Sequence, residues 1–267
     1  MVCLERSCVA DLLDSSNPYG LGGRRVLVTG TSSGIGRAVA MTFARMGAFV
    51  ICSGRDQARL EETAAMIGPE RSRAETFDLT HTDAIVHWMK ELAERHGRID
   101  GLVHAAGLQA YTPLRILDLG VWRDVSAVNC EAALALSKGF CDKTIYSGND
   151  GSIVFVSSIT GRVGTPGASV YSMTKAAIEG LTRSLAAELA RTGIRVNCIA
   201  PGCVQTPMYE RMARALSDAQ RSSLEARHLL GIGRAEDVAY AAAYLLSRAA
   251  KWVTGAVLVV DGGFSAS

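Results

Sequence analysis

Dense runs of lysine and arginine are absent from this sequence, and so are closely spaced cysteine pairs. The formal net charge is +2 and is spread along the chain, so nothing in it favours a nucleic-acid partner or an anionic membrane surface. Seven cysteines form an odd set without a C-x-x-C pair, which argues against a disulfide framework and against a zinc site. We therefore expect a reducing compartment and no bound metal.

The sequence also lacks a long hydrophobic run. A membrane-spanning helix needs ~18 uninterrupted apolar residues, and no stretch reaches that length. The first twenty residues mix acids and bases with short apolar runs, unlike a secretory signal peptide. The sequence thus predicts a cytoplasmic protein with no membrane partner, in which residues 1–22 form an N-terminal extension.

The chain does contain a regular alternation of short apolar runs and longer helical segments. The runs are continuously apolar, as expected for parallel strands that helices cover on both faces. They span residues 25–30, 49–54, 74–78, 100–107, 152–158, 195–202 and 256–263. The helical segments span 34–46, 56–67, 81–96, 121–146, 169–191 and 234–248. This order predicts one doubly wound α/β domain over residues 23–267, with an amphipathic helical lid at about 203–230.

The stretch VLVTGTSSGIG joins the first expected strand to the first expected helix. Its glycines, Gly30, Gly34 and Gly36, allow a tight turn, bring the backbone close to a pyrophosphate and let the helix pack closely on the sheet. The helix N-terminus adds a favourable field for an anion. A glycine loop in this context predicts a dinucleotide-binding site.

A tyrosine and a lysine in the segment YSMTK, Tyr171 and Lys175, lie four residues apart. One helical turn places them on the same face, although this spacing alone is common by chance. Two other features of the chain support a functional role for this pair. The glycine loop has the form T-G-x-x-x-G-x-G, and Ser158 lies thirteen residues before Tyr171.

With these motifs, residues 20–264 resemble the short-chain dehydrogenase/reductase superfamily. Further matching elements follow in order along the chain: Asp78 after the third strand, HAAG at 104–107, Asn129 in VNC, and PG at 201–202 followed by Thr206. The resemblance implies one Rossmann-type domain with a seven-stranded parallel sheet in the order 3-2-1-4-5-6-7. It also implies an NAD(P)-dependent oxidoreductase that assembles as a homotetramer or homodimer.

The resemblance implies roles for four catalytic residues. Tyr171 would donate a proton to a ketone oxygen as hydride arrives from the nicotinamide, and Ser158 would hydrogen-bond that oxygen. Lys175 would hold the nicotinamide ribose and lower the pKa of Tyr171, since a cation about 4 Å away can supply a few pKa units. Asn129 would position a water for proton resupply. The implied coenzyme-binding residues are Gly30, Ser32, Ser33, Gly34, Ile35, Gly36, Arg55, Asp78, Leu79, Ala105, Ala106, Gly107, Tyr171, Lys175, Pro201, Gly202, Val204 and Thr206.

The end of the second strand bears on which nicotinamide coenzyme is used. Proteins that bind the form without a 2′-phosphate usually have a carboxylate there, which accepts hydrogen bonds from the adenosine ribose. This chain has Gly54 followed by Arg55, and a guanidinium suits a phosphate. We therefore predict NADPH, with NADH as the alternative. Arg55 could instead be a solvated loop charge, and Asp56 could cap the next helix.

The C-terminal part of the chain, through WVTGAVLVVDGG, especially resembles bacterial 3-oxoacyl-carrier-protein reductases. However, Asn149 and Thr192 stand where such reductases have arginines that dock the carrier. The substrate could therefore be a 3-oxoacyl compound, a sugar, a polyketide or another ketone. Residues 108–115, 159–168 and 203–230 are expected to line the pocket, with apolar contributions from Tyr111, Val163, Met208 and Leu229.

Two other functions remain open at this point. One is a dinucleotide-binding relative that acts as a sensor or scaffold without turnover, and the other is a methyltransferase with a similar sheet. Neither needs the combination of Tyr171 and Lys175. For His104, at the end of a buried strand, we expect a structural hydrogen bond and not a catalytic role.

Overall fold

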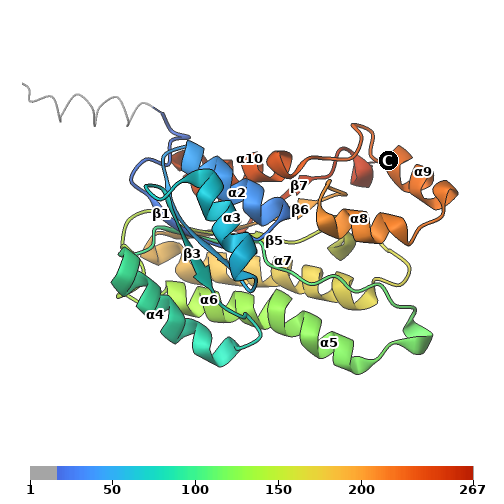
Figure 1. Ribbon diagram of the computed structural model, residues 1–267, viewed down its shortest axis with the longest axis horizontal. Coiled ribbons are helices and arrows are strands. Elements are labelled where there is room, and N and C mark those ends of the chain that lie inside the picture. Colours follow the sequence, from blue (N-terminus) through green and yellow to red (C-terminus); the bar gives the residue numbers. More distant parts are fainter. Residues whose placement is uncertain (1–16, 267) are drawn as a thin grey trace, which may run out of the picture.

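The computed structural model describes residues 17–266, which fold around one parallel β-sheet (Figure 1). Its seven strands have the order β3-β2-β1-β4-β5-β6-β7, which confirms the predicted topology. The strands are β1 (Arg25–Thr29), β2 (Phe49–Gly54), β3 (Ser72–Thr76), β4 (Gly101–His104), β5 (Gly151–Val156), β6 (Ile194–Pro201) and β7 (Val257–Val260). Within this order the polypeptide reverses its winding direction between β1 and β4, where open α/β sheets bind their ligands.

Helices cover both faces of the sheet (Figure 1). One face carries α2 (Gly34–Arg45), α3 (Gln57–Ile67) and α10 (Ala235–Leu246); the other carries α4 (Ile85–His96), α6 (Ala132–Phe140) and α7 (Ser169–Leu189). Side chains along β1 alternate between the two resulting cores. Val26 and Val28 belong to the core beneath α2 and α10, whereas Leu27 belongs to the other core. Because both faces are buried, a continuously apolar strand is the sequence pattern that results.

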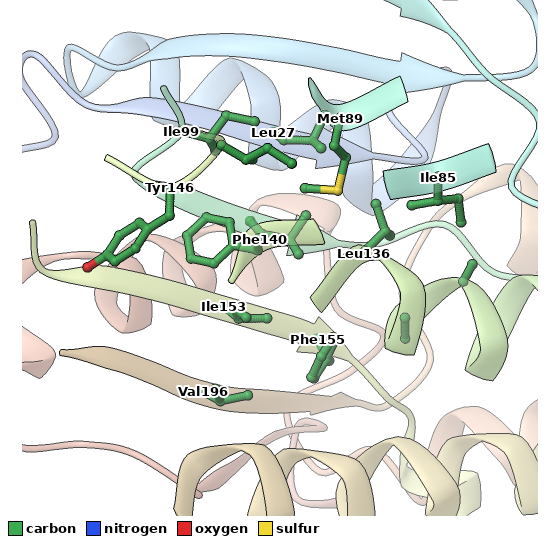
Figure 2. Packing of buried hydrophobic residues seen from close by; sticks show 14 of the residues in the cluster. Leu27, Ile85, Met89, Ile99, Leu136, Phe140, Tyr146, Ile153, Phe155 and Val196 are labelled. Carbon is green, nitrogen blue, oxygen red and sulfur yellow. The ribbon is translucent and has the colours of Figure 1, made fainter. Parts of the chain in front are cut away.

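Of the two cores, the one on the α4, α6 and α7 side contains more aromatic side chains (Figure 2). Phe140 from α6 and Phe155 from β5 are both fully buried, and Met89 from α4 lies among them. The ring of Tyr146 packs against that of Phe140 with 5.2 Å between centroids, and its hydroxyl accepts a hydrogen bond from the Gly151 amide. This packing anchors the start of β5, the strand that leads to Ser158.

The helix predicted over 121–146 differs from the observed structure. The segment is divided into α5 (Leu119–Ser126), a π-helical turn over 127–131, and α6, which ends at Phe140. Such turns often occur at functional sites because they redirect a side chain out of the regular helical pattern. Here the turn contains Asn129, which hydrogen-bonds a loop outside the helix. Residues 141–146 were wrongly assigned to the helix, since they form the turns that lead to β5.

Six of the seven strands end earlier than predicted. The fourth ends at His104 instead of residue 107, and the seventh ends at Val260 instead of residue 263. The third ends at Thr76 instead of residue 78, the fifth ends at Val156 instead of residue 158, and the first and sixth each end one residue early. Ala105, Ala106 and Gly107 leave the sheet to line a cavity, and so does Asp78. The apolar run that begins in β4 thus continues past the end of the strand into the cavity. Apolarity alone therefore does not show at which residue the strand ends.

Two short helices, α8 (Pro207–Arg214) and α9 (Asp218–Ala226), lie beyond the carboxyl end of β6 (Figure 1). Side-chain hydrogen bonds cap their N-termini: Thr206 accepts from the Tyr209 amide, and Ser217 accepts from the Gln220 amide. They occupy the segment expected to form a lid, and that role stays a prediction. The predicted extension, residues 1–22, lies mostly outside the described residues, although Leu21 is fully buried in the core. No helix within residues 17–266 is long and apolar enough to cross a membrane.

Candidate active site

A cavity of about 1220 Å³ lies at the carboxyl ends of the strands. Segments from most of the chain meet there: the glycine loop, the ends of β2, β3 and β4, the start of α7, and both short helices. Every residue predicted to bind the coenzyme lines it, as do Ser158, Tyr171 and Lys175 among the predicted catalytic residues. The structure therefore brings together side chains that are as far apart in sequence as Gly30 and Thr206.

The glycine loop follows β1 and leads directly into α2. Gly30 has φ +77°, and a Cβ there would lie 2.6 Å from the amide nitrogen of Ala106. A Cβ on Gly36 would lie 2.2 Å from the Gly30 carbonyl oxygen. Any larger side chain would separate the helix from the loop, so only glycine fits. The close approach leaves the N-terminus of α2 facing the cavity, which fits the pyrophosphate of a dinucleotide.

The far end of the cavity is formed after β2 and β3. Gly54 ends β2, and Arg55 follows it in the cavity lining. The pKa of Asp78 is lowered mainly by a hydrogen bond from the Thr80 amide, with a smaller contribution from Arg55. Asp56 caps α3 by accepting a hydrogen bond from the Arg59 amide, as the sequence had suggested. Arg59 itself lines the cavity as a second cation, and no motif in the sequence indicates this position.

Tyr171 and Lys175 lie in the first turns of α7, and both are almost completely buried. The Lys175 Nζ lies 5.5 Å from the centroid of the Tyr171 ring and donates a hydrogen bond to the Val156 carbonyl oxygen at 2.8 Å. The Ser158 hydroxyl hydrogen-bonds the Tyr171 side chain. The three groups converge on one cavity, as the spacing in the sequence predicted.

The pKa of Tyr171 is shifted in the direction opposite to our expectation. Burial raises it well above its ordinary value, the neighbouring Tyr111 raises it further, and the hydrogen bond with Ser158 only partly offsets these effects. Burial also lowers the pKa of Lys175 to about 8, so the ammonium still predominates at neutral pH. Lys175 is held over the ring by Val156, and in this arrangement burial of the phenol outweighs any stabilisation of its anion. Tyr171 is therefore a protonated phenol near neutrality, which is the form that can donate a proton.

Asn129 is the one predicted catalytic residue that does not line the cavity. Its amide Oδ1 accepts a hydrogen bond from the Leu108 nitrogen at 2.8 Å, and its Nδ2 donates to the Leu108 carbonyl at 3.0 Å. The same Nδ2 donates to the Thr174 hydroxyl, which in turn donates to the Tyr171 carbonyl. Asn129 therefore ties the loop after β4 to the helix that carries Tyr171. Nothing in the sequence distinguishes Thr174 as the link in this chain.

His104 has the structural role that the sequence suggested. Its Nε2 lies 3.2 Å from the Val128 carbonyl oxygen, which can only accept, so Nε2 carries the proton. Its Nδ1 therefore accepts from the Thr29 hydroxyl at 2.9 Å. Burial and the nearby Lys175 lower the pKa of His104 to about 3. A neutral imidazole thus joins the end of β1 to the π-helical turn beside Asn129.

The expected pocket segments contribute unequally. Tyr111 and Met208 line the cavity as predicted, but Val163 and Leu229 lie outside the residues that form it. Leu229 is 64% exposed and packs beside Gly263 instead. An adjoining pocket of about 310 Å³ opens between the loop after β4 and α8. Residues 17–266 contain no cluster of three or more His, Cys, Asp or Glu side chains that could hold a metal ion.

Comparison with known proteins places this arrangement in a family. A family model described as enoyl-(acyl carrier protein) reductase matches residues 30–265. A cis-4-hydroxycyclohexanecarboxylate dehydrogenase from Sinomonas cyclohexanicum is 38% identical, over 91% of this chain and 97% of its own. A 3-oxoacyl-[acyl-carrier-protein] reductase from Haemophilus influenzae is 33% identical, over 90% of this chain and 98% of its own.

A solved structure extends the comparison to the coenzyme. The gluconate 5-dehydrogenase from Burkholderia cenocepacia, in complex with NADP and tartrate, is 28% identical, covers 95% of this chain and 99% of its own, and superposes with a TM-score of 0.88. The fold, the glycine loop and these matches define an oxidoreductase that uses a nicotinamide dinucleotide. The chain belongs to the short-chain dehydrogenase/reductase family.

Proposed function

We propose that the protein is an NADPH-dependent carbonyl reductase, reversible as an alcohol dehydrogenase, that acts on a ketone or secondary alcohol. The observation that carries the proposal is the convergence of Ser158, Tyr171 and Lys175 on the same cavity as the glycine loop. A sensor or scaffold without turnover would not need a buried phenol next to a buried ammonium, because burying both groups is costly.

The proposed reaction assigns each side chain a separate task. The coenzyme supplies the hydride that is exchanged with the substrate carbon. Tyr171 donates its phenolic proton to the carbonyl oxygen, and Ser158 hydrogen-bonds that same oxygen. Lys175 orients the coenzyme ribose and, as a cation at neutral pH, stabilises the phenolate that remains after proton transfer. Asn129 holds the Leu108 backbone in place and keeps the loop after β4 against α7. Its involvement in resupplying protons through a water stays part of the proposal.

The raised pKa of Tyr171 predicts how the two rates depend on pH. Reduction needs the protonated phenol, and this form predominates near neutrality because burial raises the pKa of Tyr171. Oxidation needs the phenolate, which is scarce until the pH approaches that raised pKa. The rate of oxidation should therefore rise with pH above neutrality, whereas the supply of coenzyme and substrate sets the net direction.

The substrate is less narrowly defined than the reaction. One relative is named for a 3-oxoacyl substrate, and another is named for a cyclic hydroxy acid. The cavity has both apolar walls, such as Met208 and Phe264, and polar ones such as Gln109 and Ser223. We propose a ketone of modest size, with a 3-oxoacyl compound as one candidate within that class.

Turnover of a ketone panel tests the proposed function. The panel should include cyclic ketones, 3-oxoacyl thioesters, keto sugars and keto acids, each mixed with the protein and NADPH. We expect at least one class to cause loss of NADPH absorbance and to yield the matching alcohol. Absence of hydride transfer from both NADPH and NADH across the whole panel, with coenzyme binding intact, would support the sensor or scaffold alternative.

The coenzyme preference can be tested at Arg55. We propose that its guanidinium binds the 2′-phosphate, because it lines the cavity where β2 ends without a carboxylate. Replacing Arg55 with Glu should lower kcat/KM for NADPH by about 100-fold, while NADH changes less, since a charge-assisted contact is lost and a repulsion is gained. Steady-state kinetics with both coenzymes measure this. Arg191→Glu, at a site outside the cavity lining, is the matched control. An unchanged NADPH preference in Arg55→Glu would contradict the assignment.

Assembly through helices on one side of the molecule also stays a prediction. The family usually forms a dimer through the long helices after the fourth and fifth strands. In this chain those helices expose the apolar side chains Leu119, Leu134 and Met173, which are 66%, 55% and 51% accessible. These side chains support the proposal of a homodimer or homotetramer, because a second copy could bury them.

A further inference from the structure

The part of the cavity beneath α8 and α9 is positively charged. Two arginines line it: Arg211 on α8, and Arg227 directly after α9. Among the described residues that line the cavity, the only carboxylate is Asp78, which lies after β3 beside Arg55. Asp78 therefore belongs to the coenzyme end and is separated in the fold from the two short helices. An uncharged ketone would have no need of two cations on this side.

The acidic residues of the same two helices have partners other than Arg211. Glu210 pairs with Arg214 at 4.0 Å, Asp218 pairs with Arg221 at 2.9 Å, and Glu225 accepts a hydrogen bond from the Tyr209 hydroxyl. None of these three carboxylates lines the cavity. Within the described part of the chain, the carboxylates of α8 and α9 therefore do not neutralise Arg211.

Arg211 also forms part of the smaller adjoining pocket, where it is the only charged side chain among the described lining residues. The other walls include Gln109, Tyr111, Met208 and Met212. Tyr111 connects this pocket to the reactive phenol, because its ring centroid lies 6.5 Å from that of Tyr171. A ligand whose carbonyl oxygen meets Tyr171 could thus extend past the Tyr111 ring toward a guanidinium.

Arg227 is placed differently. Its guanidinium carbon lies 3.8 Å from the centroid of the Phe264 ring, a buried side chain that also lines the cavity. This stacking holds the guanidinium plane against an apolar surface. Arg227 therefore lies against an aromatic ring at the cavity wall, whereas Arg211, which is likewise exposed, lies at the second pocket.

We propose that the substrate carries a carboxylate in addition to the reacting carbonyl or alcohol, and that Arg211 binds this carboxylate. The inference rests on the proposed reductase function and narrows its substrate class. A guanidinium binds a carboxylate through two parallel hydrogen bonds, which fixes both the position and the orientation of the ligand. With the acid group held near α8, the carbonyl group is directed past Tyr111 toward Tyr171.

Ligand binding tests this proposal without requiring turnover. The full-length protein loaded with NADP⁺ is titrated calorimetrically with three carboxylates, cyclohexanecarboxylate, hexanoate and gluconate, and with the uncharged amide of each. We expect at least one carboxylate to bind about 10- to 100-fold more tightly than its amide, the range of a charge-assisted contact. Arg211→Met should abolish that preference, and Arg211→Lys should retain part of it.

Arg214→Met is the matched control, since Arg214 lies one turn further along α8, is exposed and does not line the cavity. It should keep the full carboxylate preference. The proposal is overturned if all three acids bind no better than their amides, or if Arg211→Met retains the preference. It is also overturned if Arg211→Met weakens NADP⁺ binding as much as acid binding, because Arg211 would then serve the coenzyme. A ketone panel without turnover would instead count against the reductase function, and a carboxylate preference would persist in that case.

Discussion

Replacing Tyr171 with Phe is expected to reduce kcat by about 1000-fold or more while leaving the dissociation constant of NADPH within about twofold of its original value. General acid catalysis contributes about 10²- to 10⁴-fold, and the buried phenol that lines the cavity beside Ser158 is the proposed proton donor. Phe keeps the ring that packs over Lys175, so the substitution removes the hydroxyl and little else. Single-turnover measurements with the best ketone of the panel separate this chemical step from coenzyme binding.

Tyr240→Phe provides the matched control for that variant. Tyr240 lies on α10, is 58% exposed and does not line the cavity. Removing its hydroxyl group should therefore leave kcat unchanged. A Tyr171→Phe enzyme that retained more than about a tenth of the original kcat would contradict the acid/base role. Loss of NADPH binding together with turnover would point instead to a damaged coenzyme site.

Acid is expected to destabilise the protein through His104, and His104→Asn should remove that part of the acid sensitivity. The folded-state pKa of His104 is about 3, well below the value of about 6.5 for an unfolded chain. The unfolded state therefore takes up a proton that the folded state refuses as the pH falls through about 6.5. The contribution of His104 to the free energy of unfolding is fully present above pH 6.5 and is lost as the pH falls from about 6.5 to about 3.

The expected loss is about 2 kcal/mol by pH 5 and roughly 4 to 5 kcal/mol near pH 3. Urea unfolding at pH 7 and pH 5 measures it as the difference between the original protein and His104→Asn. The variant keeps a polar side chain that can reach Thr29 or Val128, the two partners of the imidazole. His87→Asn, at a side chain that is 80% exposed, should show the same acid sensitivity as the original protein. Equal losses in all three proteins would show that His104 does not bury a neutral imidazole.

The sequence predicted the parts of the site that depend on local rules. A glycine is required where a Cβ would collide with the backbone, so Gly30 and Gly36 were recognisable from their place between a strand and a helix. Tyr171 and Lys175 share a helical face because of their spacing alone. The strands were recognisable because helices cover both faces of the sheet and make each strand continuously apolar.

Other parts could not be predicted because they depend on contacts between distant segments. The π-helical turn at 127–131 has no signature in a long amphipathic helix, yet it directs Asn129 toward Leu108 and Thr174. The pKa of Tyr171 was expected to fall because a lysine lies one turn away. It rises instead because burial is the largest effect and the hydrogen bond with Ser158 only partly offsets it, and burial is a property of the whole fold.

The amino-acid sequence by itself determined the order of strands and helices along the chain and the glycine loop between the first strand and the first helix. These features follow from periodicity and from steric limits on the backbone, which act over a few residues. The groups expected near the reactive end of the coenzyme were instead implied by the resemblance to a known family. Only the tertiary structure decided which charges share a cavity, since α8 and the segment after α9 bring Arg211 and Arg227 to the same wall from different elements. Charge in a cavity depends on which side chains face inward and which pair elsewhere, and packing in three dimensions sets that outcome.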